Sequence, residues 1–270
     1  MKTFIPAIEA NGAHFQAKIH IFNEQVDFPV LETLELRKMN DLEEIWSKNL
    51  LPSSFCELRD LNVSNCDKLL LLIPSNLQNK LQKLERISVS DCKSLEEIFE
   101  FRRLNEVGGQ DVTVSLPQNM HRSRVDLDQN PAFQNLNSIQ ISGCGSLRNL
   151  LSPYMAKGLV NLKNLSVSEC PMMEEIIRKP AEGEEIEDKA MLPQISSLTL
   201  DCLPKLTSFS QDINTFEWPL MEQINVKECT ILKTFFFKLV STPPLEKVEV
   251  DKRHGDCWWH RNIHIMWRHS

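Results

Sequence analysis

One short segment recurs along the chain at a nearly fixed spacing. Residues 61–69 read LNVSNCDKL, and residues 87–95, which lie 26 positions later, read ISVSDCKSL. Further copies are IQISGCGSL at 139–147, LSVSECPMM at 165–173 and INVKECTIL at 224–232. A fixed period of this length is the signature of a repeat architecture, in which each copy is one structural unit. The repeat therefore constrains the fold more than any other feature of the chain.

The apolar positions of the repeat predict its local structure. Residues 34–42 and 198–206 keep the frame with Met39 and Leu203 in place of the cysteine, and an eighth copy from Val248 keeps only the opening. Another apolar residue lies three positions before each opening, so the unit reads LxxLxLxx(C/L)xxL. Apolar residues at positions i and i+2 predict a short strand with one buried face.

A second apolar group follows each predicted strand. Examples are LEEIW at 42–46, LEEIF at 95–99, MEEII at 173–177 and LKTFF at 232–236. We expect a turn or a short irregular helix there, packed behind the strand. One unit cannot bury its own apolar face, so its stability must come from stacking against its neighbours. The sequence therefore predicts an α/β repeat protein: a leucine-rich-repeat solenoid, or horseshoe, with a parallel concave sheet and an irregular or short helical convex side.

The 270 residues hold eight recognisable repeats, with space for one more. We expect the solenoid over residues 28–253, a partial repeat in the N-terminal segment 1–27, and a capping tail at 254–270. The tail would then cover the last apolar repeat, because open solenoids need capping units, whereas the N-terminal side begins directly at the apolar repeat FPVLETLEL.

Two segments interrupt the expected solenoid. Residues 101–132 open like a repeat and then lose the frame, so we interpret them as a degenerate repeat with Val125 and Leu127 as a residual strand. Residues 179–190 are acidic and lack aromatic side chains, which is typical of a solvated loop.

The recurring cysteine is best explained by packing. Five cysteines share one slot of the repeat: Cys66, Cys92, Cys144, Cys170 and Cys229. A free thiol behaves as a small apolar group, and Met39 and Leu203 occupy the same slot in other copies. A disulfide framework is the alternative, but side chains one strand spacing apart and pointing in parallel have poor geometry for it. We expect these thiols to be reduced and buried.

Composition and motifs argue against several functions. A net charge of −7 gives no basic footprint for nucleic acid, and no apolar run is long enough to span a membrane. The N-terminus lacks a signal-peptide core, so the chain is expected to be cytoplasmic. N-glycosylation motifs at Asn62 and Asn164 would instead point to a secreted protein, but both fall inside predicted strands.

No catalytic, cofactor or metal site is predicted, and the chain is not expected to be an enzyme. The serines of the strands recur with the repeat rather than beside one activating histidine. The tail offers zinc-ligand types at His254, Cys257, His260, His264 and His269. Their spacing lacks the paired motifs of known zinc folds, and the neighbouring tryptophans favour an apolar cap.

A binding surface can be placed by the strand period, because residues that alternate with the buried pair face the concave side. One column of that side comprises Glu35, Asn62, Ser88, Gln140, Ser166, Thr199 and Asn225. A second column comprises Arg37, Ser64, Ser90, Ser142, Ser168, Asp201 and Lys227. The columns would continue to Glu249 and Asp251. The middle of this surface is small and neutral, whereas its ends carry charges of both signs. A merely solvated face is the plain alternative to a protein-binding one.

Most of the chain, from about Phe22 onward, resembles the C-terminal leucine-rich region of plant intracellular nucleotide-binding disease-resistance proteins of the coiled-coil class. The resemblance rests on the paired cysteine repeats at 55–100 and 133–177, their EEI endings, and the LPKL variant at 203–206. It implies a role in defence by binding a protein: a pathogen effector, a guarded host protein or the receptor's own switch domains.

The resemblance is limited to the sensing end of that family. The sequence has no GxxxxGK[ST] motif and no coiled-coil heptads before the repeats, so the nucleotide-binding switch is absent from it. A substrate adaptor for ubiquitin ligation is the alternative function, since similar repeats occur in such adaptors, although no helical docking segment precedes the repeats.

Overall fold

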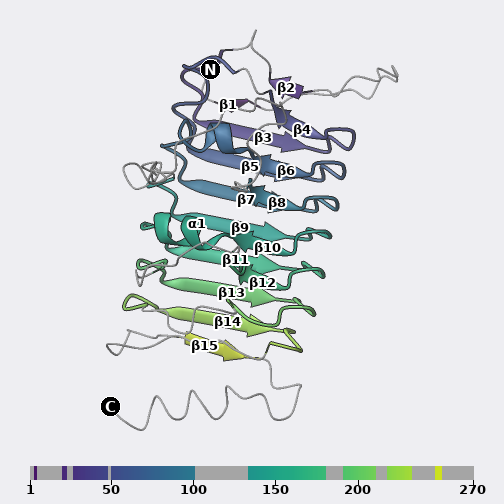
Figure 1. Ribbon diagram of the computed structural model, residues 1–270, viewed down its shortest axis with the longest axis vertical. Coiled ribbons are helices and arrows are strands. Elements are labelled where there is room, and N and C mark those ends of the chain that lie inside the picture. Colours follow the sequence, from purple (N-terminus) through teal and green to yellow (C-terminus); the bar gives the residue numbers. More distant parts are fainter. Residues whose placement is uncertain are drawn as a thin grey trace, which may run out of the picture.

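The chain folds into a stack of turns, each of which carries one strand of a long sheet and a shorter return segment (Figure 1). The computed structural model describes residues 3–4, 20–22, 27–47, 50–100, 133–180, 191–210, 218–232 and 247–250. The expected residual strand at Val125 and Leu127, the acidic segment beyond Pro180 and the C-terminal tail lie outside these residues.

The long sheet is parallel and has nine strands in the order β1-β3-β5-β7-β9-β11-β13-β14-β15. Their bounds are β1 Thr3–Phe4, β3 Thr33–Arg37, β5 Asp60–Ser64, β7 Arg86–Ser90, β9 Ser138–Ser142, β11 Asn164–Ser168, β13 Ser197–Asp201, β14 Gln223–Lys227 and β15 Lys247–Val250. Each of the eight recognised sequence copies supplies one strand, from β3 to β15. Their opening apolar residues pair directly across the sheet, as in Leu34 with Leu61 and Leu61 with Ile87. The predicted leucine-rich-repeat solenoid is therefore confirmed.

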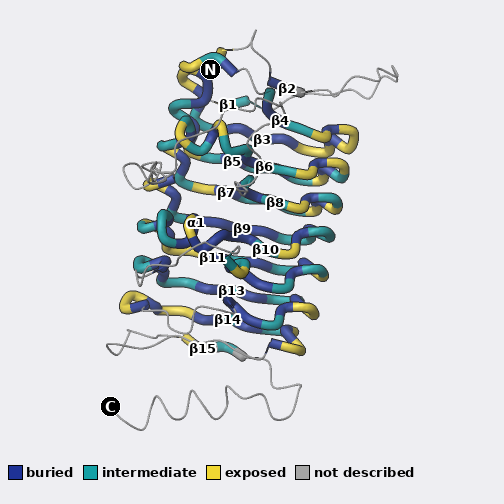
Figure 2. Tube along the Cα trace, viewed as in Figure 1, coloured by how far each residue is buried: buried dark blue, intermediate teal, exposed yellow. Residues whose placement is uncertain are grey.

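The core runs as one cluster through the stack, between the long sheet and the return segments (Figure 2). The inward residues of the strands are almost inaccessible: Leu61 is 0 % exposed and Val63 is 2 % exposed. Burying a Leu, Ile or Val side chain fully contributes about 1.5 to 3 kcal/mol relative to leaving it exposed. One turn by itself would leave these side chains in water on two sides, so the stacking of turns provides the stability.

A left-handed residue follows most strands and turns the chain back toward the core. Asn65 (φ 53°), Asp91 (φ 55°) and Gly143 (φ 65°) occupy this position in consecutive turns. Each N–H donates to the last carbonyl of the next strand, for example Asn65 to Ser90 at 3.0 Å. Because this bond bridges two turns, the conformation is maintained even where the residue is not glycine.

The residue after this turn occupies the cysteine slot, and its burial is confirmed. Cys66, Cys92, Cys144 and Cys170 are 0 % exposed and Cys229 is 8 % exposed, and all five thiols are free. Each sulfur lies near the carbonyl two residues earlier, at 3.5 Å for Cys66 to Ser64 and 3.2 Å for Cys170 to Ser168. The slot thus suits a small apolar side chain with a weak donor.

Burial also changes the acidity of these thiols. It raises the pKa of Cys229 to about 12. Contact with the Cys66 thiol, together with burial, raises the pKa of Cys92. Cys92 and Cys229 are therefore protonated at neutral pH, which is the opposite of what a reactive thiol requires. Contact with the Cys92 thiol lowers the pKa of Cys66, and contact with the Cys144 thiol lowers the pKa of Cys170.

The return segments differ from the expectation. The groups LEEIW, LEEIF and MEEII were predicted to form a turn or short irregular helix, and this prediction is wrong. They form the short strands β4 (Glu44–Trp46), β8 (Glu97–Phe99) and β12 (Glu175–Ile177). With β2 (His20–Phe22), β6 (Leu71–Ile73) and β10 (Asn149–Leu151) they build a four-stranded parallel sheet, β2-β4-β6-β8, and a two-stranded one, β10-β12.

The physical reason is backbone pairing between turns. Glu97 N–H donates to the Leu70 carbonyl at 3.2 Å, and Arg178 N–H donates to the Leu151 carbonyl at 2.9 Å. Buried backbone groups need partners, and the neighbouring turn supplies them at the same position. Helical structure in the described residues is limited to η1 (Ser75–Leu77) and α1 (Pro153–Gly158), where the Ser152 hydroxyl accepts from Met155 N–H at 3.1 Å as an N-cap.

The strand β7 pairs directly with β9, although residues 101–132 separate their turns in sequence. Ser88 pairs with Gln140 and Ser90 with Ser142, so the long sheet is continuous across this segment. At the N-terminal end of the stack, five aromatic rings pack together beside β1 and β2. Phe22 contacts Phe4, Phe28, Trp46 and Phe55, with ring centroids between 5.0 and 5.7 Å apart.

Candidate functional site

The residues predicted for the concave surface that the structure describes lie on one face of the long sheet. Cross-strand pairing aligns Glu35, Asn62, Ser88, Gln140, Ser166, Thr199, Asn225 and Glu249 in one column. The same pairing aligns Arg37, Ser64, Ser90, Ser142, Ser168, Asp201 and Lys227 in the second column. Asp251 lies outside the described residues. These side chains are half-buried or exposed, while the residues between them are buried.

A third column of residues on this face was not predicted from the sequence. It comprises Thr33, Asp60, Arg86, Ser138, Asn164, Ser197, Gln223 and Lys247. Each of these residues immediately precedes the first buried residue of its strand, so the two-residue period places it beside the first predicted column. The two-residue period of the strands was the sequence signal that could have identified this third column. We call the three columns together the polar sheet face.

The charges on the polar sheet face are neutralised by close neighbours. At one end Arg37 forms an ion pair with Glu35, and the Arg86 guanidinium pairs with both oxygens of Asp60. At the other end Glu249 lies 3.1 Å from Lys227 and 3.2 Å from Lys247, and these two cations lower the pKa of its carboxyl group. The face therefore presents little net charge, despite the net charge of −7 of the chain.

The centre of the face consists of hydroxyl and amide groups. Within the described part of the chain, the side chains of Ser88, Gln140 and Ser166 make no hydrogen bond. The side-chain oxygen of Asn225 is buried and likewise without a partner among the described residues. Such groups keep their hydrogen-bonding capacity for water or for a bound partner.

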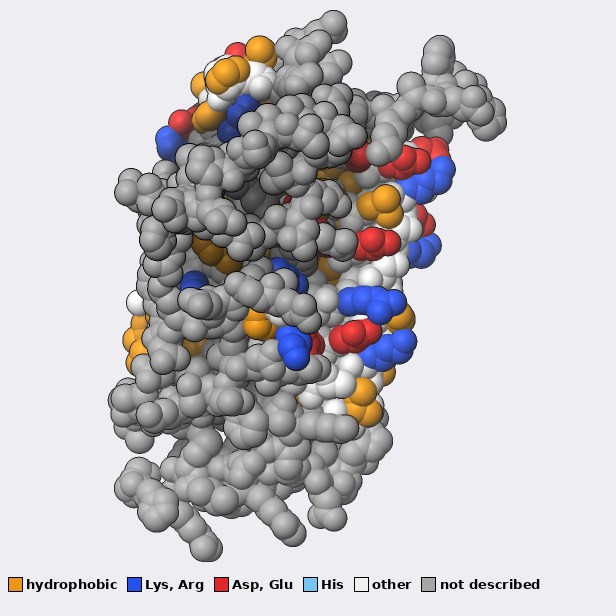
Figure 3. Space-filling view, viewed as in Figure 1, with side chains coloured by type: hydrophobic (Ala, Val, Ile, Leu, Met, Phe, Trp, Pro, Cys, Tyr) orange, Lys and Arg blue, Asp and Glu red, His pale blue; other side chains and the backbone are white. Residues whose placement is uncertain are grey.

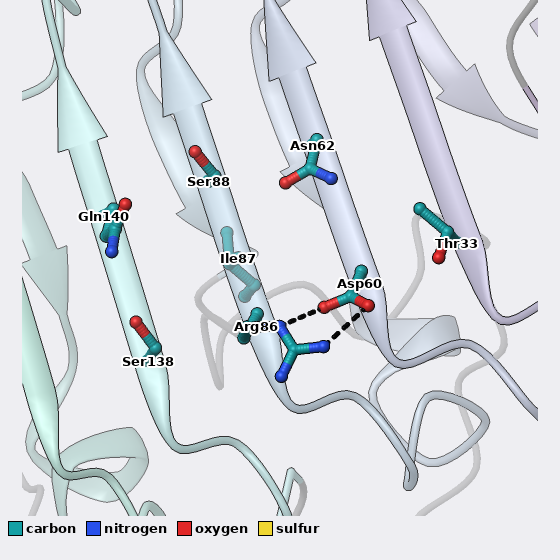
Figure 4. A pocket seen from close by; sticks show the side chains of 8 residues that line it. All are labelled: Thr33, Asp60, Asn62, Arg86, Ile87, Ser88, Ser138 and Gln140. Atoms are coloured by element: carbon teal, nitrogen blue, oxygen red, sulfur yellow. Dashed lines mark hydrogen bonds and ion pairs between the residues drawn. The ribbon is translucent and has the colours of Figure 1, made fainter.

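A pocket of about 310 Å³ opens on the polar sheet face across β3, β5, β7 and β9 (Figure 4). The third column contributes Thr33, Asp60, Arg86 and Ser138 to its lining. The first column contributes Asn62, Ser88 and Gln140, and Ile87 completes it. Because β7 pairs directly with β9, residues on both sides of segment 101–132 line one pocket.

The edge of the stack is charged but balanced. Figure 3 shows acidic and basic side chains alternating along one edge. Pairs that bridge successive turns include Lys68 with Asp41 at 2.7 Å, Lys93 with Asp67 at 2.8 Å and Arg148 with Glu174 at 3.3 Å. Exposed ion pairs contribute little stability each, so this edge serves mainly to keep the stack solvated.

The described residues show neither a metal-binding cluster nor a membrane-spanning helix. They contain no group of three or more His, Cys, Asp or Glu side chains that could hold a metal ion. No helix among them is long and apolar enough to cross a membrane. The histidines of the tail, considered above as zinc ligands, lie outside the described residues.

Comparison with known proteins agrees with this architecture. The family model described as plant disease resistance protein RPS2-like, leucine-rich repeats, matches residues 30–171 and 117–252. The chain belongs to this family. Two probable disease resistance proteins of Arabidopsis thaliana are similar to this leucine-rich-repeat chain. One is 30 % identical over 151 residues, which cover 55 % of the chain and 15 % of the relative. The other is 30 % identical over 106 residues, which cover 39 % of the chain and 11 % of the relative. The matched segment is thus a small part of each relative.

Proposed function

We propose that this leucine-rich-repeat chain is a protein-recognition module of plant defence, which binds its partner on the polar sheet face. The observation that carries the proposal is the alignment of three columns of polar side chains on one continuous sheet. A partner that touches several turns of such a sheet gains contacts without ordering a flexible surface. The proposal places the chain in the cytoplasm and assigns it no catalytic step.

The chemistry of the face supports a protein partner rather than a charged polymer. Its centre offers hydroxyl and amide groups that both donate and accept, which matches the peptide groups and polar side chains of a protein surface. Its charged residues other than Asp201 form ion pairs with their neighbours, so steering by net charge contributes little. The partner classes implied by the family resemblance are all proteins: a pathogen effector, a guarded host protein or the receptor's own switch domains.

The experiment replaces two small residues at the centre of the face. The double variant Ser88→Arg with Ser166→Arg places two long cations on adjacent parts of the sheet without touching the core, because both serines point away from it. We expect proteins captured from plant extract by the wild-type chain to be lost with this variant. The melting temperature should stay nearly unchanged.

A matched control adds the same charge elsewhere. Asn79 and Gln134 are exposed residues outside the strands. The double variant Asn79→Arg with Gln134→Arg should therefore retain the captured proteins. If the same proteins bind the Ser88/Ser166 variant as well as wild type, while both variants remain folded, the recognition surface is not the polar sheet face.

A further inference from the structure

The pocket on the polar sheet face has a neutral but strongly hydrogen-bonding lining. Arg86 Nη2 donates to Asp60 Oδ2 at 2.8 Å, and Arg86 Nε pairs with the other carboxylate oxygen (Figure 4). Glu85 Oε2 lies 3.6 Å from Arg86 Nη1, and Glu85 is itself paired with Arg59. The formal charges at this end of the pocket therefore cancel.

One lining residue is largely buried but keeps its hydroxyl group available. Ser138 is 7 % exposed and lines the pocket, and its side chain makes no hydrogen bond to any described residue. Its hydroxyl oxygen is accessible in the pocket, where it can hydrogen-bond to water or to a group of a bound partner. Asn62, Ser88 and Gln140 around it add amide and hydroxyl groups that can both donate and accept.

The size of the pocket limits what can supply those partners. Its 310 Å³ is room enough for a side chain of a bound protein. That space suits one polar side chain of a bound protein together with a few waters. A charged side chain would find no free counter-ion there, because Asp60 and Arg86 already neutralise each other.

We propose that this pocket selects an uncharged carboxamide or hydroxyl side chain of the protein partner, with the Asp60–Arg86 pair as the specificity determinant. The inference rests on the proposed function, since it concerns one position of the same face. Each member of the pair masks the charge of the other. Removing one member therefore converts a neutral pocket into a charged one and changes the side chain it accepts.

The test uses the full chain and a random peptide library displayed on phage. Peptides selected on wild type should carry Asn, Gln, Ser or Thr at one fixed position. Asp60→Asn, which exposes the Arg86 charge, should shift that position to Asp or Glu. Arg86→Gln, which exposes Asp60, should shift it to Lys or Arg. We expect each shift in enrichment to be on the order of tenfold.

Two controls make the outcomes separable. Asp201→Asn removes the same charge from the same face but lies outside the pocket on β13, so it should leave the selected position neutral. Melting curves confirm that each variant is folded. Enrichment of charged residues on wild type, or equal enrichment on wild type and both pocket variants, overturns the pocket assignment. If the selected peptides also bind the double variant Ser88→Arg with Ser166→Arg undiminished, both the pocket assignment and the proposed function fail.

Discussion

The cysteine slot provides a quantitative test of the packing argument through the substitution Cys66→Ser. Cys66 is 0 % exposed, and its sulfur lies 3.5 Å from the Ser64 carbonyl oxygen. The C–O bond of serine is shorter than the C–S bond it replaces, so the hydroxyl oxygen is held farther from that carbonyl. A good O–H···O bond needs roughly 2.5 to 3.0 Å. The new hydroxyl is therefore buried without a well-placed acceptor.

The magnitude follows from the two costs involved. Burying an unsatisfied hydroxyl costs about 1 to 3 kcal/mol. The substitution Cys66→Ala instead loses one apolar atom and leaves a small cavity, at a cost on the order of 1 kcal/mol. Serine should thus destabilise the chain by more than alanine does, although serine fills more of the slot.

Urea unfolding followed by circular dichroism measures both free energies of unfolding, provided that the dependence on urea is unchanged. Cys202→Ser is the matched control. Cys202 is half-buried, lies one residue before the slot filled by Leu203, and its sulfur is 3.2 Å from a carboxylate oxygen of Glu228. That change should stay within about 0.5 kcal/mol of wild type. A Cys66→Ser variant as stable as Cys66→Ala would refute the reasoning.

Three further outcomes are expected. In the native chain a thiol reagent should modify Cys56, which is half-buried, well before Cys66, Cys92, Cys144, Cys170 and Cys229; equal labelling rates by mass spectrometry would contradict the burial. The folded pKa of Cys229, about 12, exceeds the ordinary value of 9.0, so the stability contributed by its burial is complete below pH 9 and is lost as pH rises from 9 toward 12. The difference in free energy of unfolding between wild type and Cys229→Ala should therefore shrink above pH 9, and a constant difference through that window would argue against the shift. Trp46 Nε1 donates to the Leu72 carbonyl at 2.7 Å between two return strands. Trp46→Phe should therefore lower the free energy of unfolding by about 1 to 3 kcal/mol, measured by urea unfolding. An unchanged midpoint would show that water replaces this bond.

The repeat in the sequence by itself determined the main features of the long sheet. Leu34, Leu61 and Ile87 recur at one position of the unit, and they pair directly across neighbouring strands. The polar residues that alternate with them were placed on the correct face for the same reason. Both results follow from local periodicity, because a two-residue period fixes the side of the sheet and a repeat of about 26 residues fixes the neighbour.

Only the tertiary structure decided the features that depend on contacts between turns. The return segments are too short for a period of their own, and hydrogen bonds such as Glu97 N–H to the Leu70 carbonyl make them strands. The direct pairing of β7 with β9 could not be read from a sequence that separates them by segment 101–132. The Asp60–Arg86 pair and the pocket around Ser138 likewise join residues of different turns, and the stacking of the turns sets their distance and burial.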